Sequence, residues 1–210
     1  MKKISVFNHV SIDGFFSGPN NEIDWFKSLK KDIVWDEYTH SQAKSGNTLL
    51  FGHTTYNLMK SYWPTSKAMQ DNPDMASGME LSTKIVFSKK IKQEDEGDNW
   101  ENVKVMPEIN PREIMKMKEE EDMTILGSGS IVQQFAQHNL IDEYNLVVVP
   151  VTLGKGKPLF KDFNKLSLDL LEARSFKNGI VLLRYQPINN SKANSFQQET
   201  HKPDKQPYLE

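Results

Sequence analysis

The run TILGSGSIVQQF at residues 124–135 constrains the fold more than any other part of the chain. A short apolar segment leads into Gly-Ser-Gly-Ser, and a segment with helical apolar spacing follows. The run therefore predicts a strand, a tight glycine turn and a helix. A second apolar strand, within residues 143–151, comes next. A strand, a helix and a strand in this order are typical of α/β proteins.

The same alternation extends along most of the chain. Residues 65–82 have weak periodicity and are predicted to be loop with some helix, and residues 154–160 are predicted to be loop. The predicted strands lie at residues 3–12, 48–52, 84–88 and 103–106. The predicted helices cover residues 24–43, in one or two pieces with Asp24 as the N-cap, 53–64, and a segment from Pro111 that Asn110 caps.

The chain closes with a predicted β-hairpin, LSLDLLEARSFKNGIVLLRYQP, with Asn178-Gly179 as its turn. The predicted fold class is therefore α/β, a three-layer α/β/α domain with a mixed, mostly parallel central sheet and a C-terminal β-hairpin. This domain is predicted to span residues 1–187. Residues 188–210 are polar and nearly free of aliphatic side chains, and are predicted to be a disordered tail.

Composition excludes several classes of function. The 210-residue chain has a formal net charge of −2, so no basic field indicates a nucleic-acid partner. It has no cysteine, which excludes disulfides, thiolate catalysis and cysteine-ligated zinc, and no metal site is expected. Its apolar runs are shorter than the roughly 20 residues of a membrane span. A soluble, cytoplasmic protein without a membrane partner is expected.

The glycine turn has two interpretations at this point. Free N–H groups at the start of the following helix would favour an anion such as a pyrophosphate, with Ser128 and Ser130 adding hydroxyl donors. Alternatively the turn is only structural, with Ser130 as an ordinary N-cap. GSGSIV lacks the third glycine of the Rossmann fingerprint, and no Gly-Lys-Ser/Thr marks a P-loop.

Four separated segments carry a resemblance to a known family. SVFNHVSIDGFFSG, LLFGHTTYNLM, KIVFSKK and TILGSGSIVQQF occur in this order before LIDEYNLVVVPVTLGKGKPLF. Together they resemble the dihydrofolate-reductase-like superfamily, in particular the C-terminal reductase domain of bacterial RibD and its stand-alone relatives. The resemblance covers residues 2–186. It implies a dihydrofolate-reductase-like fold, bound NADPH, a small-molecule substrate and a homodimer.

The resemblance also implies two cofactor-binding motifs. One is a G-R-x-T-[YW] motif that binds phosphate at a helix N-terminus. It is matched at Gly52, Thr55 and Tyr56, with Thr54 between them and His53 where the family usually has arginine. This substitution leaves phosphate binding in question, because arginine is a permanent charge and histidine is mostly neutral near pH 7. The glycine turn would receive the pyrophosphate, through Gly127, Ser128, Gly129, Ser130 and Ile131.

Three further residues match the position where family members hold the adenosine 2′-phosphate. Ser88 would donate a hydroxyl, and Lys89 or Lys90 would supply charge. Adjacent lysines are otherwise usually a solvated turn. The expected preference for NADPH over NADH depends mainly on these residues.

The expected substrate mouth lies at the end of the first strand. Ser11, Asp13 and Gly14 match an S-x-D-G signature of the family and would lie near the nicotinamide, although Asp-Gly also favours a plain turn. By resemblance to dihydrofolate reductases, which use an acid on the first helix, Asp36 is a candidate proton donor, and Asp13 and Asp24 are comparable candidates. Trp25 is a candidate wall for a planar substrate, or else a core aromatic.

The resemblance implies an NADPH-dependent reductase that transfers a hydride to a small carbonyl, imine or heterocyclic substrate. The activity would resemble that of 5-amino-6-(5-phosphoribosylamino)uracil reductase in riboflavin biosynthesis. The chain has only three arginines, Arg112, Arg174 and Arg184, and no evident basic cluster for the phosphate of such a substrate. The alternatives are a dihydrofolate reductase, or a non-catalytic nucleotide-binding or regulatory protein on the same fold.

Overall fold

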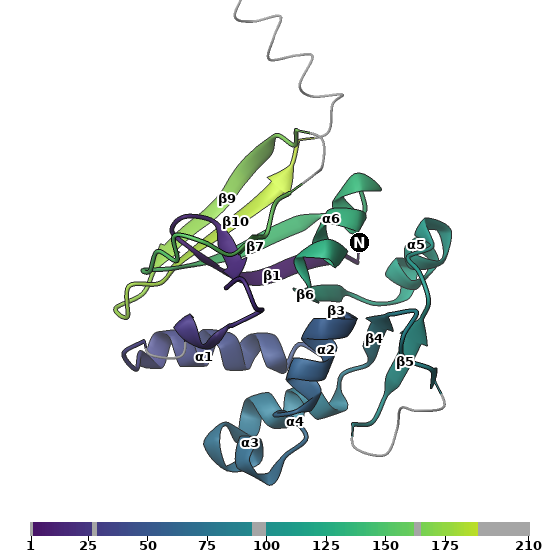
Figure 1. Cartoon of the computed structure of the whole chain (residues 1–210), viewed down its shortest axis with the longest axis horizontal. Helices are drawn as coiled ribbons and strands as arrows, with labels where there is room; N and C mark the ends of the chain where they lie inside the picture. The colour runs from purple at the N-terminus through teal and green to yellow at the C-terminus, as the bar shows by residue number, and fades with distance from the viewer. Residues whose placement is uncertain (1, 27–28, 94–99, 162–164, 189–210) are drawn as a thin grey trace, which may run out of the picture.

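A central eight-stranded sheet organises the protein in the computed structural model, which describes residues 2–26, 29–93, 100–161 and 165–188. The strand order is β5-β4-β3-β6-β1-β7-β10-β9 (Figure 1). The pairs from β5 to β7 are parallel, and β10 pairs antiparallel with β7 and β9. The strands are β1 (Ile4–Ser11), β3 (Thr48–Gly52), β4 (Lys84–Phe87), β5 (Val103–Met106), β6 (Met123–Gly127), β7 (Glu143–Val149), β9 (Leu168–Ser175) and β10 (Val181–Pro187).

Helices cover both faces of this sheet, which makes the predicted three layers. Helices α5 and α6 lie on one face, and α1, α2 and α4 lie on the other (Figure 1). The mixed, mostly parallel α/β/α prediction is therefore confirmed. The helices are α1 (Ile33–Ala43), α2 (His53–Lys60), α3 (Ser66–Asp71), α4 (Pro73–Leu81), α5 (Pro111–Glu120) and α6 (Gly129–Gln137), with a 3-10 turn, η1 (Asp24–Phe26).

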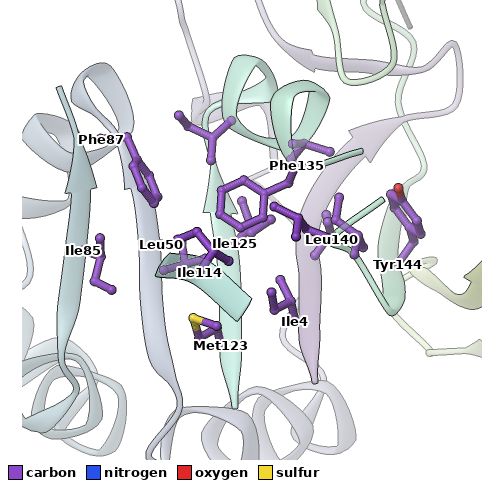
Figure 2. Close-up of a cluster of buried hydrophobic side chains, with 14 of the residues drawn as sticks. Ile4, Leu50, Ile85, Phe87, Ile114, Met123, Ile125, Phe135, Leu140 and Tyr144 are labelled. Atoms are coloured by element: carbon purple, nitrogen blue, oxygen red, sulfur yellow. The ribbon is translucent and has the colours of Figure 1, made fainter. Parts of the chain in front are cut away.

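The main core lies between the sheet and the α5–α6 layer. Alternate residues of β1, including Ile4 and Val6, point into it and are fully buried. Phe135 of α6 and Ile114 of α5 pack in the same cluster, from the helical layer (Figure 2). The other face of β1 presents Phe7 toward the aromatic side chains of α1 and η1. Both faces of the central strands are thus covered, as parallel sheets require.

The helix predicted over residues 24–43, in one or two pieces, is present as two short pieces. Residues 24–26 form a 3-10 turn, and α1 begins only at Ile33. Its N-cap is Asp32 instead of Asp24, because the Asp32 carboxylate accepts the N–H groups of Val34 and Trp35. The apparent stripe of Trp25, Leu29 and Ile33 is not one helical face, since Ile33 is 68% exposed.

Two other segments differ from prediction. Residues 65–82 were predicted to be loop with some helix, but most of them form α3 and α4. Thr65 is the N-cap of α3, and Pro73 is the first residue of α4. The loop predicted at 154–160 contains β8 (Lys157–Pro158), which pairs with β2 (Phe15–Ser17). This small second sheet joins the segment after β1 to the segment after β7.

The predicted closing hairpin and the predicted cap of α5 are both confirmed. Strands β9 and β10 flank the turn, where Gly179 has φ +89°. The Asn110 side chain accepts the N–H groups of Arg112 and Glu113. The predicted tail at 188–210 lies outside the described residues apart from residue 188.

Candidate functional site

A cavity of about 670 Å³ opens beside the carboxyl ends of β1 and β6. The start of α2, the glycine turn and the β2–β8 sheet surround one end of it. This is the edge at which open α/β sheets bind ligands. Of the predicted site residues, Thr54, Thr55, Ser128, Gly129 and Ser130 line the cavity together.

The glycine turn packs directly against the start of α2. Gly127 has φ +134°, and its peptide bond to Ser128 is cis. A Cβ on Gly127 would lie 2.9 Å from Phe16 Cζ and 3.0 Å from Thr55 Oγ1, so no side chain fits there. A Cβ on Gly52 would similarly lie 2.6 Å from Ser128 Oγ. Two motifs about 75 residues apart in the chain therefore form one surface.

Neither helix that begins at this surface has a side-chain cap. Gly52 occupies the N-cap of α2 and has no side chain to offer. Ser128 occupies the N-cap of α6, but its hydroxyl lies 2.7 Å from the Ser130 hydroxyl and makes no capping bond. Helices usually satisfy their first N–H groups with a capping oxygen. Two helix starts without one, both at the cavity, fit the phosphates of a dinucleotide.

Ile131 and His53 lie at these helix starts without reaching the cavity. The Ile131 side chain is only 4% exposed and belongs to the main core, and its N–H bonds to Ser128 O at 3.0 Å. The His53 ring lies 3.2 Å from the amide of Asn57, one turn further along α2. Neither side chain lines the cavity, so any role in binding falls to their backbone or to the rim.

Ser88, Lys89 and Lys90 follow β4 at the same edge of the sheet. The register pairs Phe87 with Gly52, so this turn lies next to the start of α2. The Ser88 hydroxyl accepts the N–H groups of Lys90 and Ile91, which gives it a structural role in the turn. Both lysines are exposed, and none of the three residues lines the cavity.

Asp13 does not line the cavity, and its hydrogen bonds connect the loop after β1 to the loop after β7. Its carboxylate accepts the Ser11 hydroxyl at 2.6 Å and the N–H groups of Leu153 and Gly154. The Ser11 hydrogen bond, with these backbone bonds, lowers the pKa of Asp13. An ionised carboxylate engaged in this way is a poor proton donor, and neither Ser11 nor the adjacent Gly14 lines the cavity.

The structure also places Asp36 and Trp25 away from the cavity. Asp36 lies in the first turn of α1, and no carboxyl side chain among the described residues lines the cavity. Trp25 packs in the cluster between α1 and the sheet. Its neighbour Phe26 provides the cavity wall that was predicted for Trp25.

His9 is a cavity residue that the sequence pattern did not identify. It lies on β1, and its ring stacks on Phe26 with centroids 4.5 Å apart. Trp35 and Phe7 meet the His9 ring edge-on. Burial lowers the pKa of His9 to about 4, so the imidazole is neutral at physiological pH. Its place on a strand looked like part of an alternating apolar pattern, which gave no signal of a ligand-facing role.

Apolar side chains form the remaining wall of the cavity and were also not predicted. Leu58 and Met59 come from α2, Trp63 from the turn after it, and Met75 and Met79 from α4. Their convergence depends on how α4 packs beside α2, which a sequence pattern does not express.

Comparison with known proteins identifies the family. A sequence model of the RibD C-terminal domain matches residues 2–182. The chain belongs to the RibD C-terminal domain family. YyaP, an uncharacterized protein of Bacillus subtilis (strain 168), is 28% identical over 177 residues, which are 84% of this chain and 90% of YyaP.

Two solved structures share the fold. A Shewanella sp. PV-4 protein assigned to riboflavin biosynthesis superposes with a TM-score of 0.71 at 20% identity, covering 89% of this chain and 99% of its own. A pyrimidine reductase-like protein of Corynebacterium diphtheriae gives 0.59 at 16% identity, covering 90% and 92%. Across the described residues, no helix is both long and apolar enough to cross a membrane.

Proposed function

We propose that this member of the RibD C-terminal domain family is an NADPH-dependent reductase. The observation that carries the proposal is the pair of uncapped helix N-termini, α2 and α6, that converge on one cavity. NADPH would supply the hydride that reduces a carbonyl, imine or heterocyclic carbon. A homodimer, which the family resemblance implies, and a cytoplasmic location, which the sequence composition led us to expect, are part of the same proposal.

The chain's own groups would hold the cofactor phosphates. The N–H groups at the start of α6 and the hydroxyls of Ser128 and Ser130 offer donors to the pyrophosphate. Thr54 and Thr55 add hydroxyls from the start of α2. The positive end of each helix dipole favours the negative charge. Because Gly127 and Gly52 have no side chain, these two segments can lie in close contact, and neither position has room for a Cβ.

The 2′-phosphate of NADPH would lie beside the turn after β4. Lys89 and Lys90 are exposed there, next to the start of α2. Exposed lysines would attract the 2′-phosphate mainly through their charge. Because salt screens this attraction, the preference for NADPH over NADH would weaken at high ionic strength.

Proton delivery would not need a carboxylic acid. Neither Asp13 nor Asp36 lines the cavity, and His9 is neutral because burial lowers its pKa to about 4. Solvent water would therefore provide the proton for the reduced oxygen or nitrogen. His9 would act by position, as a flat ring held by Phe26.

Cofactor titration tests the proposal. The dissociation constants for NADPH and NADH are measured with the wild-type chain and with the Lys89→Ala, Lys90→Ala double variant. The wild type is expected to prefer NADPH, and the double variant to lose most of that preference without losing NADH binding. Equal affinities of the wild type for both cofactors would remove the NADPH assignment. An assay with dihydrofolate and NADPH tests the alternative: turnover would support a dihydrofolate reductase, and no turnover would exclude that activity.

A further inference from the structure

The two ends of the cavity differ in their chemistry. The glycine-turn end offers hydroxyls and helix N-termini, as described above. The other end is walled by Leu58, Met59, Trp63, Met75 and Met79. Thr54 and Leu58 both line the cavity from α2 and are four residues apart, about 6 Å along the helix axis. The polar end and the apolar end are therefore adjacent parts of one binding site.

Positive charge in the cavity wall comes from one segment of the chain. The cationic side chains that line the cavity are Lys157 and Lys161, within the described part of the chain. Both lie on the segment that includes β8, and this segment borders the glycine turn, since a Cβ on Gly129 would lie 3.6 Å from Pro158 O. The chain's three arginines line no part of the cavity.

Arg184, one of these arginines, is held by ion pairs away from the cavity. Its guanidinium bonds to the carboxylates of Glu143 and Glu172 at 2.8 Å. A substrate phosphate at the apolar end would thus meet no arginine, although arginine is the side chain best suited to bind phosphate in two-point fashion. Burying a phosphate there without such a partner would be costly.

The apolar end is shaped by soft, adaptable side chains. The Trp63 indole N–H points at Met59 Sδ, 3.1 Å away, which holds the indole against α2. Met79 is 5% exposed and links this wall to the buried cluster behind it. Methionine and tryptophan together favour flat, polarisable ligands, and methionine accommodates more than one shape.

A second cavity of about 150 Å³, here called the side chamber, lies against residues of α1 and α4, and Met75 and Met79 line it as well as the main cavity. His9, Phe7 and Leu126 line both the chamber and the main cavity. No carboxylate, lysine or arginine of the described chain lines the chamber. The Ser5 and Thr124 hydroxyls on its floor lie 3.3 Å apart and bond to one another. The chamber therefore suits a small uncharged group.

We infer that the hydride acceptor is an uncharged, largely apolar carbonyl compound with a flat body, and not a phosphorylated sugar derivative. This inference rests on the proposed NADPH-dependent function. In the reaction, the carbonyl carbon gains a hydride from NADPH and the oxygen gains a proton from water. The products are an alcohol and NADP⁺, so two electrons are transferred. The flat body would lie between His9 and the Met59–Trp63 wall.

Two ketones test the inference with the full chain and NADPH. One is 1-phenyl-1,2-propanedione, which is apolar and flat, and the other is dihydroxyacetone phosphate. We expect kcat/KM for the aromatic diketone to exceed that for the phosphorylated ketone by about 100-fold or more, the scale of discrimination by a pocket that lacks a needed partner. The NADPH dissociation constant is measured separately by fluorescence.

A charge placed at the apolar end provides the matched variant. Leu58→Glu adds a carboxylate to the cavity wall at a position that is 39% exposed, so the variant is expected to fold. Leu81→Glu makes the same change at the end of α4, where the side chain is 76% exposed and outside the cavity. Leu58→Glu should lower kcat/KM for the diketone about tenfold, equivalent to about 1.4 kcal/mol, and Leu81→Glu should leave it unchanged.

The outcomes separate the two levels of the proposal. A protein that binds NADPH but reduces no aromatic diketone, or that reduces dihydroxyacetone phosphate more efficiently, overturns the substrate inference alone. Equal effects of Leu58→Glu and Leu81→Glu overturn it as well. A protein that does not bind NADPH overturns the proposed function and the substrate inference together.

Discussion

The ring of His9 stacks on the ring of Phe26 at a centroid separation of 4.5 Å and an interplanar angle of 12°. The stack joins β1 to the 3-10 turn that follows β2, and both rings line the cavity. It thereby places a neutral, planar group where a substrate would lie. A histidine at this site also makes the stability of the fold depend on pH in a definite direction.

Acidification should destabilise the fold through His9. The pKa of His9 is lowered by burial to about 4 from 6.5, so the unfolded chain takes up the proton first as the pH falls. The contribution of His9 is complete above pH 6.5 and is lost as the pH falls toward 4. Between pH 7 and 4.5 this loss is about 2 kcal/mol. Urea unfolding of wild type and His9→Phe at both pH values measures it, and His9→Phe should lose less stability. Identical losses would contradict the assignment.

Lys84 should have the corresponding effect at alkaline pH. Its ammonium is fully buried, donates to the carbonyl oxygens of Glu80 and Glu101 at 2.7 Å, and lies over the Trp100 ring. Burial lowers the pKa of Lys84 to about 8 from 10.5. The unfolded chain therefore binds more protons between these values, and stability should rise with pH.

The expected rise between pH 7.5 and 9.5 is about 2 kcal/mol. The free energy of unfolding is compared at these two pH values for the wild type and Lys84→Met. Lys84→Met should show little of the rise, because its side chain does not titrate. A rise of equal size in both proteins would mean that other groups cause it.

Asp13 should prove structural instead of catalytic. Asp13→Asn keeps the size of the side chain but weakens the bonds to Ser11 and Gly154, so the melting temperature should fall. Turnover by the folded variant should stay near the wild-type value, because Asp13 does not line the cavity. A general acid contributes about 100-fold or more to the rate. A loss of that size in a folded Asp13→Asn protein would restore Asp13 as the proton donor.

Alanine substitutions at Gly127 and Gly154 should distinguish the cost of backbone strain from the cost of steric clash. Gly127 and Gly154 both have positive φ, but a Cβ on Gly154 would meet no atom within 4 Å, while one on Gly127 would meet Phe16 and Thr55. Gly154→Ala should cost about 1 kcal/mol, and Gly127→Ala about 1–3 kcal/mol more. NADPH affinity should fall only in Gly127→Ala. Equal unfolding free energies for the two variants would indicate that the glycine turn rearranges freely.

The local parts of the fold and site could be predicted from sequence, and the parts that depend on distant packing could not. The strands and the segments around Gly52 and Gly127 are continuous in the chain, so their patterns identified them. The cavity wall combines His9, Phe26 and the residues of α2 and α4, which come together only through tertiary packing. The hydrogen bonds of the Asp13 carboxylate could not be predicted either, because the motif alone does not reveal that the backbone N–H groups of Leu153 and Gly154 bond to it.

A similar limit applies to residues 24–43. Trp25, Leu29 and Ile33 have helical spacing, but Trp25 and Leu29 pack against the cluster on the sheet, and Ile33 is exposed. The Asp32 carboxylate, by capping α1 and accepting the N–H of Asn178, sets the start of the helix. That second bond comes from the closing hairpin, far away in the sequence.

Calorimetric titration of NADPH into the wild type and Ser130→Asp tests the central claim most directly. Ser130 is exposed at the start of α6, where a carboxylate favours the helix by about 0.3–1 kcal/mol but repels a bound pyrophosphate. The account predicts saturable binding by the wild type, at least about tenfold weaker binding by Ser130→Asp, and an undiminished melting temperature of the cofactor-free variant. No binding at millimolar NADPH, or equal affinities in the two proteins, would contradict it.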